Sequence, residues 1–201
     1  MYKIITISRE YGSGGRYVGN VLAEKLGIPF YDRELIAMLA EKSNYSKKYI
    51  EKTEDVRTTS FLYGLATEGI YMSNPYDSLT PTDKIFFAQD EIIKELAEKG
   101  PCIIIGRSAD YILRERDDVL NVFISCDMKH RIERAVKYYK IEEKNAERTL
   151  RKKDKARASK YNYYTDRVWG TPDNYDLAIN TGTFTIEQAA DIIARCYKGE
   201  L

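Results

Sequence analysis

The sequence has few of the residues that build most metal centres and hydrolase sites. Among 201 residues it has one histidine, His130, and three widely separated cysteines, Cys102, Cys126 and Cys196. A multi-histidine metal site or a Ser-His hydrolase would depend on that single histidine, so neither is favoured. Three dispersed cysteines do not form a disulfide framework. They are typical of buried, reduced thiols, and we therefore expect a cytoplasmic protein.

An excess of charge of one sign and long apolar runs are also missing. Lys and Arg total 32 against 31 Asp and Glu, so the net charge of +1 gives no general attraction to nucleic acid or membrane. No apolar run has the length needed to span a bilayer, and a strand-like segment stands at residues 2–7, where a signal peptide would be. We therefore expect no membrane association, and any anion-binding site has to be local.

What the sequence does contain is a regular alternation of short apolar runs and helical stripes. The clearest strands are predicted at 3–8, 102–105 and 120–125, with shorter candidates at 28–31 and 176–180. The alternation predicts an α/β fold with a parallel sheet, and the length fits one domain. The unbroken apolar run at 102–105 is typical of a strand that is covered on both faces.

Helical spacing fills the segments between these strands. An apolar stripe at 18–26 ends at Gly27, a typical C-cap, and another at 128–139 follows Asp127, a plausible N-cap. Two further amphipathic helices are predicted at 85–99 and 186–197.

Two segments fall outside this alternation. Residues 54–81 are rich in Gly, Ser, Thr, Asn and Pro, and we predict that they form an insertion that caps the site. Residues 148–160 contain seven Lys or Arg and the single acid Asp154. A charged run is usually a solvated helix face, and that interpretation stays open beside a role in binding an anion.

The segment 8–17, SREYGSGGRY, carries the clearest signal for a ligand. Its glycines follow a buried strand and open a helix, where free amides and the helix dipole converge on an anion. We predict that this loop binds phosphate groups through residues Gly12, Ser13, Gly14, Gly15, Arg16 and Tyr17.

The loop departs from the usual phosphate-binding pattern G-x-x-x-x-G-K-[ST]. With Gly14 as the second glycine, Arg9 stands where the first should be, and Gly15 stands where the lysine should be. Arg16 is the nearest cation in sequence, so we expect it to neutralise the transferring phosphoryl group and Gly15→Lys to be tolerated. The usual hydroxyl ligand of Mg²⁺ is also displaced, which leaves Ser13 as a possible metal ligand.

Several segments together resemble the cytidylate kinase-like family of P-loop nucleoside monophosphate kinases. They are ITISREYGSGGR, LAEKLGIPFYDRELI, IIIGRSADYIL, VFISCDMKHRIERA and YDLAINTGTFTIEQAADII. The resemblance implies a three-layer α/β/α sandwich with a roughly five-stranded parallel sheet, a helical insertion at 54–81 and a helical lid at 142–166, in one domain over residues 1–201. It also implies ATP, Mg²⁺ and a small phosphate-bearing acceptor, with CMP or dCMP as the default. It leaves the oligomeric state open.

The resemblance also assigns roles to individual residues. Asp32 and Arg33 match positions on the acceptor side, and Arg107 and Ser108 match the motif that holds the acceptor phosphate. Lys153, Asp154 and Arg157 fall in the lid, where family arginines bridge the two substrates, so Lys153, Arg157, Arg107 and Arg16 are the expected catalytic cations. Two plainer interpretations compete: Asp32 could cap the following helix, and Arg107 could pair with a carboxylate.

Three substitutions separate the chain from authentic cytidylate kinases. Gly15 replaces the loop lysine, Ser108 replaces an aspartate, and Arg33 replaces a serine. A non-catalytic nucleotide-binding module with a degenerate loop is therefore the main alternative to an ATP-dependent phosphotransferase. Binding of nucleic acid by residues 148–160 is a weaker third alternative.

Overall fold

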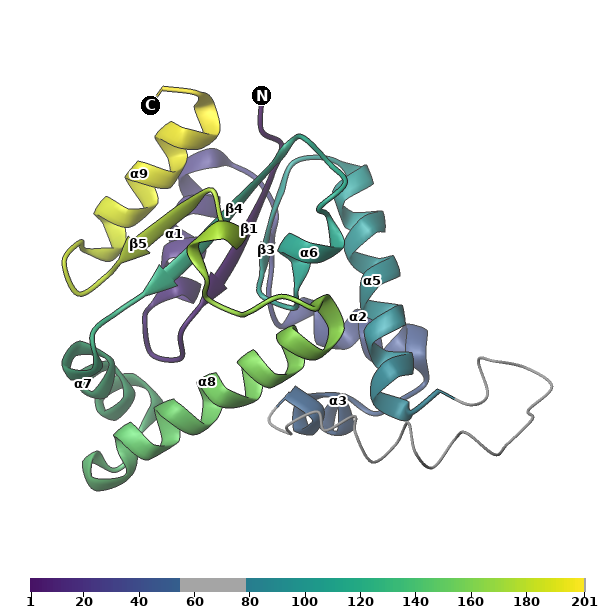
Figure 1. Cartoon of the computed structure of the whole chain (residues 1–201). Helices are drawn as coiled ribbons and strands as arrows, with labels where there is room; N and C mark the ends of the chain where they lie inside the picture. The colour runs from purple at the N-terminus through teal and green to yellow at the C-terminus, as the bar shows by residue number, and fades with distance from the viewer. Residues whose placement is uncertain (55–78, 201) are drawn as a thin grey trace.

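The computed structural model describes residues 1–54 and 79–200, and its centre is a sheet of five parallel strands in the order β2-β3-β1-β4-β5 (Figure 1). The strands are β1 (Ile4–Arg9), β2 (Phe30–Tyr31), β3 (Cys102–Ile105), β4 (Val119–Ser125) and β5 (Leu177–Asn180). The predicted parallel sheet is confirmed. Its strand limits shift by a residue or two, because main-chain pairing and not hydrophobicity sets where a strand ends.

Helices cover both faces of the sheet and complete three layers. They are α1 (Gly15–Leu26), α2 (Glu34–Ser43), α3 (Lys47–Glu54), α5 (Pro81–Lys99), α6 (Ala109–Ile112), α7 (Met128–Tyr139), α8 (Glu143–Thr165) and α9 (Ile186–Lys198), with a short 3-10 turn η1 (Pro172–Asn174). Helices α1 and α9 pack on one face, against side chains such as Ile5 and Ile103. Helices α2, α5 and α6 pack on the other, against Ile4 and Ile104. Alternate residues of one strand thus serve opposite cores.

The predicted helix ends are set by specific caps. Helix α1 ends at Gly27 in the left-handed region, and the Asp127 side chain accepts a hydrogen bond from the His130 amide at the start of α7. Helix α5 begins at Pro81, earlier than the predicted 85, because Thr80 and its N3 residue form a capping box before the apolar stripe starts.

Helix α8 spans nearly all of the predicted lid range, 142–166, as one continuous helix of 23 residues. It crosses the edge of the sheet at which the strands end (Figure 1). The predicted insertion at 54–81 lies almost entirely outside the described residues. In the ranges 1–54 and 79–200, no helix combines the length and hydrophobicity needed to cross a bilayer.

The last helix offers a test of local stability. At the start of α9, the Thr185 hydroxyl accepts a hydrogen bond from the Gln188 backbone amide, and the Gln188 side-chain oxygen accepts one from the Thr185 backbone amide. We expect Thr185→Ala to lower the free energy of unfolding by about 1 kcal/mol, measured by urea denaturation. Thr183→Ala, in the exposed turn before it, is the matched control. Equal stability of the two variants would contradict the role of the cap.

Candidate functional site

A cavity of about 560 Å³ opens where β1 and β3 end, between the glycine loop and helix α8. Seven cationic side chains line it: Arg9, Arg16, Arg33, Arg107, Lys153, Arg157 and Lys160. Three carboxylates line it as well: Glu10, Asp32 and Glu51. The chain as a whole is almost neutral, so this pocket concentrates positive charge and suits a ligand with several negative charges.

The glycine loop adopts a conformation that needs glycine at two positions. Gly12 and Gly14 both have φ of +85°, in the left-handed region. Gly14 is the N-cap residue of α1 and offers no capping side chain, so the first amides of the helix are free for an anion. Gly12, Gly14, Gly15 and Arg16, four of the six residues predicted to bind phosphate, line the pocket.

Two members of the predicted loop set point elsewhere. Ser13 is fully buried and its hydroxyl donates to the Glu10 carbonyl at 2.9 Å, so it does not face the cavity in which Mg²⁺ would bind. Tyr17 is 41% exposed and packs its ring on Tyr138. Their side chains shape the loop and the start of α1, and neither is aimed at a ligand.

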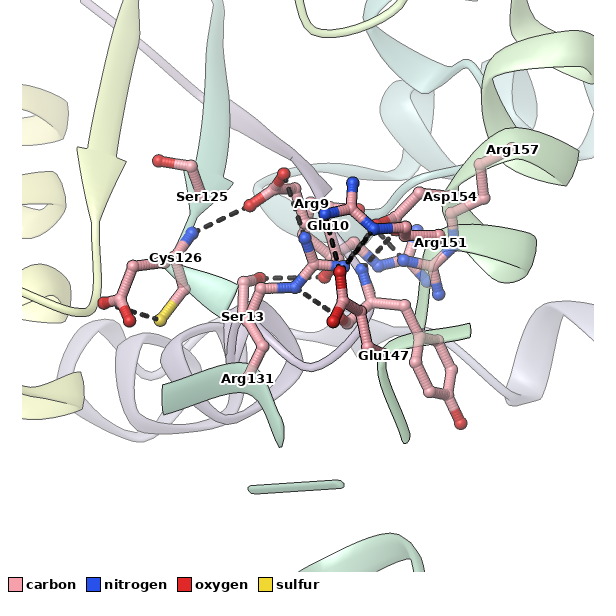
Figure 2. Close-up of polar contacts among 12 residues, drawn as sticks. Arg9, Glu10, Ser13, Ser125, Cys126, Arg131, Glu147, Arg151, Asp154 and Arg157 are labelled. Carbon is pink, nitrogen blue, oxygen red and sulfur yellow. Dashed lines mark hydrogen bonds and ion pairs between the residues drawn. The ribbon is translucent and has the colours of Figure 1, made fainter. Parts of the chain in front are cut away.

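A buried arginine that the sequence did not single out organises the loop. Arg131 of α7 is 4% exposed and pairs with Glu10 at 3.2 Å and with Asp154 of α8 (Figure 2). Its Nε also donates to the Tyr11 carbonyl at 2.9 Å. Asp154 in turn accepts a hydrogen bond from the Tyr11 amide at 2.6 Å. The predicted lid therefore places a carboxylate on an amide of the glycine loop.

The next turn of α7 supports the other side of the loop. Arg134 donates to the carbonyl oxygens of Ser13, at 3.1 Å, and Thr181, at 2.9 Å. Arg131 and Arg134 lie three residues apart on one face of the helix, a spacing visible in the RIER stretch. The sequence could have shown that both side chains lie on the same face of the helix, but not that they donate to the glycine loop.

The turn after β3 presents Arg107 to the pocket through an unusual backbone. Gly106, Arg107 and Ser108 have φ of +63°, +59° and +54°. Two consecutive residues with side chains in the left-handed region are costly, and such geometry concentrates at binding sites. The side chain of Gln89 secures the turn by donating to the Arg107 carbonyl at 2.7 Å. Ser108 is buried as the N-cap residue of α6.

The Arg16 side chain forms an ion pair with Asp32, one of the predicted acceptor-side residues. Its Nε is 2.9 Å from the Asp32 carboxylate, so the side chain points toward the end of β2. The alternative that Asp32 caps α2 is wrong, because Arg33 is the N-cap residue. Asp32 and Arg33 both line the pocket, which brings the two predicted acceptor-side residues together.

Helix α8 contributes cations to the pocket and also packs as part of the fold. Lys153, Arg157 and Lys160 line the cavity, whereas Arg151 is exposed and pairs with Glu147 one turn earlier. The solvated-face interpretation therefore holds for only one side of this helix. The tyrosines at its end have packing roles: Tyr161 donates to Asp110 at 2.6 Å and Tyr164 donates to Asp83 at 2.9 Å.

The Asp110 contact makes stability depend on pH. Burial raises the pKa of the Asp110 carboxyl, and the hydrogen bond from Tyr161 offsets part of that effect. The folded protein therefore holds this proton to a higher pH than the unfolded chain does. The contribution of Asp110 to the free energy of unfolding should fall as the pH rises from about 4 through the raised folded value.

We expect this decrease in the stability of the natural chain relative to Asp110→Asn, measured by urea denaturation at a series of pH values. Asparagine is neutral throughout and keeps an oxygen that can accept from Tyr161, so other titrating groups cancel in the difference. A difference that stays constant between pH 4 and 8 would contradict the raised pKa.

Within residues 1–54 and 79–200, one group of potential metal ligands lies outside this pocket. Cys126, Asp127 and His130 bring three ligand atoms within 4.8 Å of one another. Asp127 is already the N-cap of α7, and the guanidinium of Arg134 lies 3.1 Å from the Cys126 sulfur. A cation there would face that positive charge.

Comparison with known families decides the classification. Residues 4–183 match the cytidylate kinase-like family. The chain belongs to this family. Membership supports a kinase-like P-loop phosphotransferase as the coarse class of activity, which agrees with the resemblance seen in the sequence.

Solved structures share the fold of this chain. An uncharacterised protein from Eubacterium ventriosum is 27% identical, with a TM-score of 0.71 over 97% of this chain and 98% of that one. A shikimate kinase from Acinetobacter baumannii, in complex with shikimate, is 15% identical, with a TM-score of 0.54 over 100% and 95% of the two chains. A sugar kinase from a Janibacter species is 14% identical, with a TM-score of 0.55 over 99% and 95%. No curated protein matches the chain.

Proposed function

We propose that this chain transfers the γ-phosphoryl group of ATP to a small phosphate-bearing acceptor, with CMP or dCMP as the default. The observation that carries the proposal is a pocket that is lined by seven cationic residues together with the glycine loop. A loose phosphoryl-transfer transition state spreads negative charge over several oxygens, so positioned cations and amides supply most of the catalysis.

The two ends of the pocket suit two substrates. The loop at Gly12–Gly15 would hold the phosphates of ATP, and Arg107, with Asp32 and Arg33, would hold the acceptor across the cavity. Lys153 and Arg157 reach in from α8 and would cover the transferring group and exclude water. Because Arg33 and Ser108 replace residues of authentic cytidylate kinases, the acceptor is the less supported part of the proposal.

The residues present also fit Mg²⁺. This ion usually binds one or two carboxylates together with substrate phosphates, and Glu10 and Asp32 are carboxylates that line the cavity. These two line the cavity, which the buried Ser13 hydroxyl does not, although the ion would share Glu10 with Arg131 and Asp32 with Arg16. When bound, Mg²⁺ would neutralise charge on the phosphates.

The main alternative is a nucleotide-binding module without turnover. The Asp154 carboxylate favours this alternative, because it already accepts the hydrogen bond from the Tyr11 amide that a bound phosphate would accept. In the phosphotransferase, by contrast, ATP displaces this carboxylate when it binds.

The experiment is a transfer assay with radiolabelled ATP and Mg²⁺ over a panel of acceptors. The panel holds CMP, dCMP, the other nucleoside monophosphates, shikimate and simple sugars. Shikimate and sugars are included because a shikimate kinase and a sugar kinase have similar folds. We expect label on a phosphate-bearing acceptor. ATP binding without transfer to any member of the panel would favour the regulatory module.

A further inference from the structure

The side chain of Arg9 runs across the floor of the pocket between two glycines. Arg9 is the last residue of β1, and a Cβ built on Gly15 would lie 2.7 Å from its Cβ. A Cβ built on Gly106, after β3, would overlap Nη1 of the same arginine. The guanidinium therefore lies over the end of β3, and only glycine at both positions leaves room for it.

These contacts explain the two departures in the loop as a single exchange. The usual pattern has glycine at the first position and lysine after the last glycine. Here Arg9 holds the first position, Gly15 holds the lysine position, and the stem of Arg9 fills the space beside Gly15. The cation has moved from the start of the helix to the end of the strand.

The location of the Arg9 guanidinium suits a phosphoryl group in transit. It lies at Gly106, next to the turn that presents Arg107, while its own backbone leads into the glycine loop. The Arg9 carbonyl accepts a hydrogen bond from Arg157 of α8 at 2.9 Å, which ties its backbone to the lid helix (Figure 2). Arg16 points away to Asp32 and is less suited to this place.

We propose that Arg9 is the catalytic cation that replaces the missing loop lysine and binds the terminal phosphates of ATP. This inference rests on the proposed function and assigns its central charge to a residue other than Arg16. Arg9 takes no part in making or breaking bonds. Its two parallel N–H donors suit the phosphate oxygens, on which charge develops during transfer.

The test combines ATP and AMP affinity by calorimetry with the rate of ATP turnover. We expect Arg9→Ala to weaken ATP binding at least tenfold, to leave AMP binding nearly unchanged, and to slow turnover by about 100-fold or more. Arg9→Gln, which keeps a side chain in the space over Gly15 and Gly106, should show the same loss. Arg16→Ala should lose less ATP affinity and less turnover than Arg9→Ala.

The exchange itself predicts a reciprocal rescue. Gly15→Lys alone should lose activity, because the new Cβ meets the stem of Arg9. The double variant Arg9→Gly with Gly15→Lys removes that contact and restores the usual pattern. Its rate of ATP turnover should therefore be at least tenfold higher than that of Arg9→Ala.

The outcomes separate the two proposals. If Arg9→Gln binds ATP and turns it over like the natural chain, the role of Arg9 is wrong while the proposed function stands. If the natural chain neither binds ATP nor turns it over, the proposed function is wrong, and the role of Arg9, which depends on it, is wrong as well. Recovery of ATP turnover in the double variant, absent from Arg9→Ala and from Gly15→Lys, would support the exchange.

Discussion

Replacing Arg131 by methionine is expected to lower the free energy of unfolding by about 3–5 kcal/mol. The change leaves Glu10 and Asp154 without the cation that neutralises both, and it removes the donor to the Tyr11 carbonyl. Methionine fills much of the space, so the loss reports the charge and its hydrogen bonds more than a cavity. Urea denaturation measures the effect.

Arg151→Met is the matched control for this prediction. Arg151 makes an ion pair of similar length, 2.8 Å to Glu147, but its side chain is 67% exposed. Exposed pairs contribute about 0–1 kcal/mol, so the control should be nearly as stable as the natural chain. If the two variants lost the same amount of stability, Arg131 would not be the residue that holds the loop to α8.

Replacing Arg107 by alanine is expected to lower kcat/KM for the phosphate-bearing acceptor by about 100- to 1000-fold. The guanidinium faces the pocket from a turn that is held by Gln89 and is strained in the left-handed region. Alanine adds no backbone strain beyond that of arginine, so the fold should survive. Steady-state kinetics with varied acceptor and saturating ATP measures the loss.

Two comparisons make the Arg107 result specific. ATP affinity should be unchanged, because the glycine loop and Arg9, and not Arg107, are proposed to hold the phosphates of ATP. Arg114→Ala, which removes an exposed arginine stacked on Tyr111 outside the pocket, should keep full activity. A loss of ATP binding as large as the loss of acceptor turnover would place Arg107 on the donor side.

The fold could be predicted because its signals are local. Buried parallel strands are continuous apolar runs, and helices carry stripes with their caps, so the strand at 102–105 and the cap at Asp127 could be seen directly. The glycine loop could be predicted for the same reason, since left-handed turns and free amides need glycine at particular positions.

The cations could not be assigned in the same way. Arg16 follows the position of the missing lysine in the sequence, yet its side chain pairs with Asp32. The side chain of Arg9 instead occupies the space beside Gly15. Arg131 reaches a loop more than a hundred residues earlier in the chain. The direction of a long side chain depends on contacts far along the sequence, which periodicity does not report.

The structure argues against the expectation that Gly15→Lys is tolerated, for this physical reason. From the sequence, Gly15 looks like a lost lysine whose side-chain space is left empty. In the structure that place holds the stem of Arg9, 2.7 Å from where a side chain on Gly15 would begin. The chain departs from the usual pattern at two positions that compensate for each other.

The central claim is that the loop amides and the surrounding cations bind a chain of phosphates. Its most direct test is calorimetric titration of the natural protein with adenosine, AMP, ADP and ATP in Mg²⁺. We predict that each added phosphate tightens binding about tenfold and that high salt weakens the series. Adenosine that binds as tightly as ATP, or no binding of ATP at all, would contradict the account.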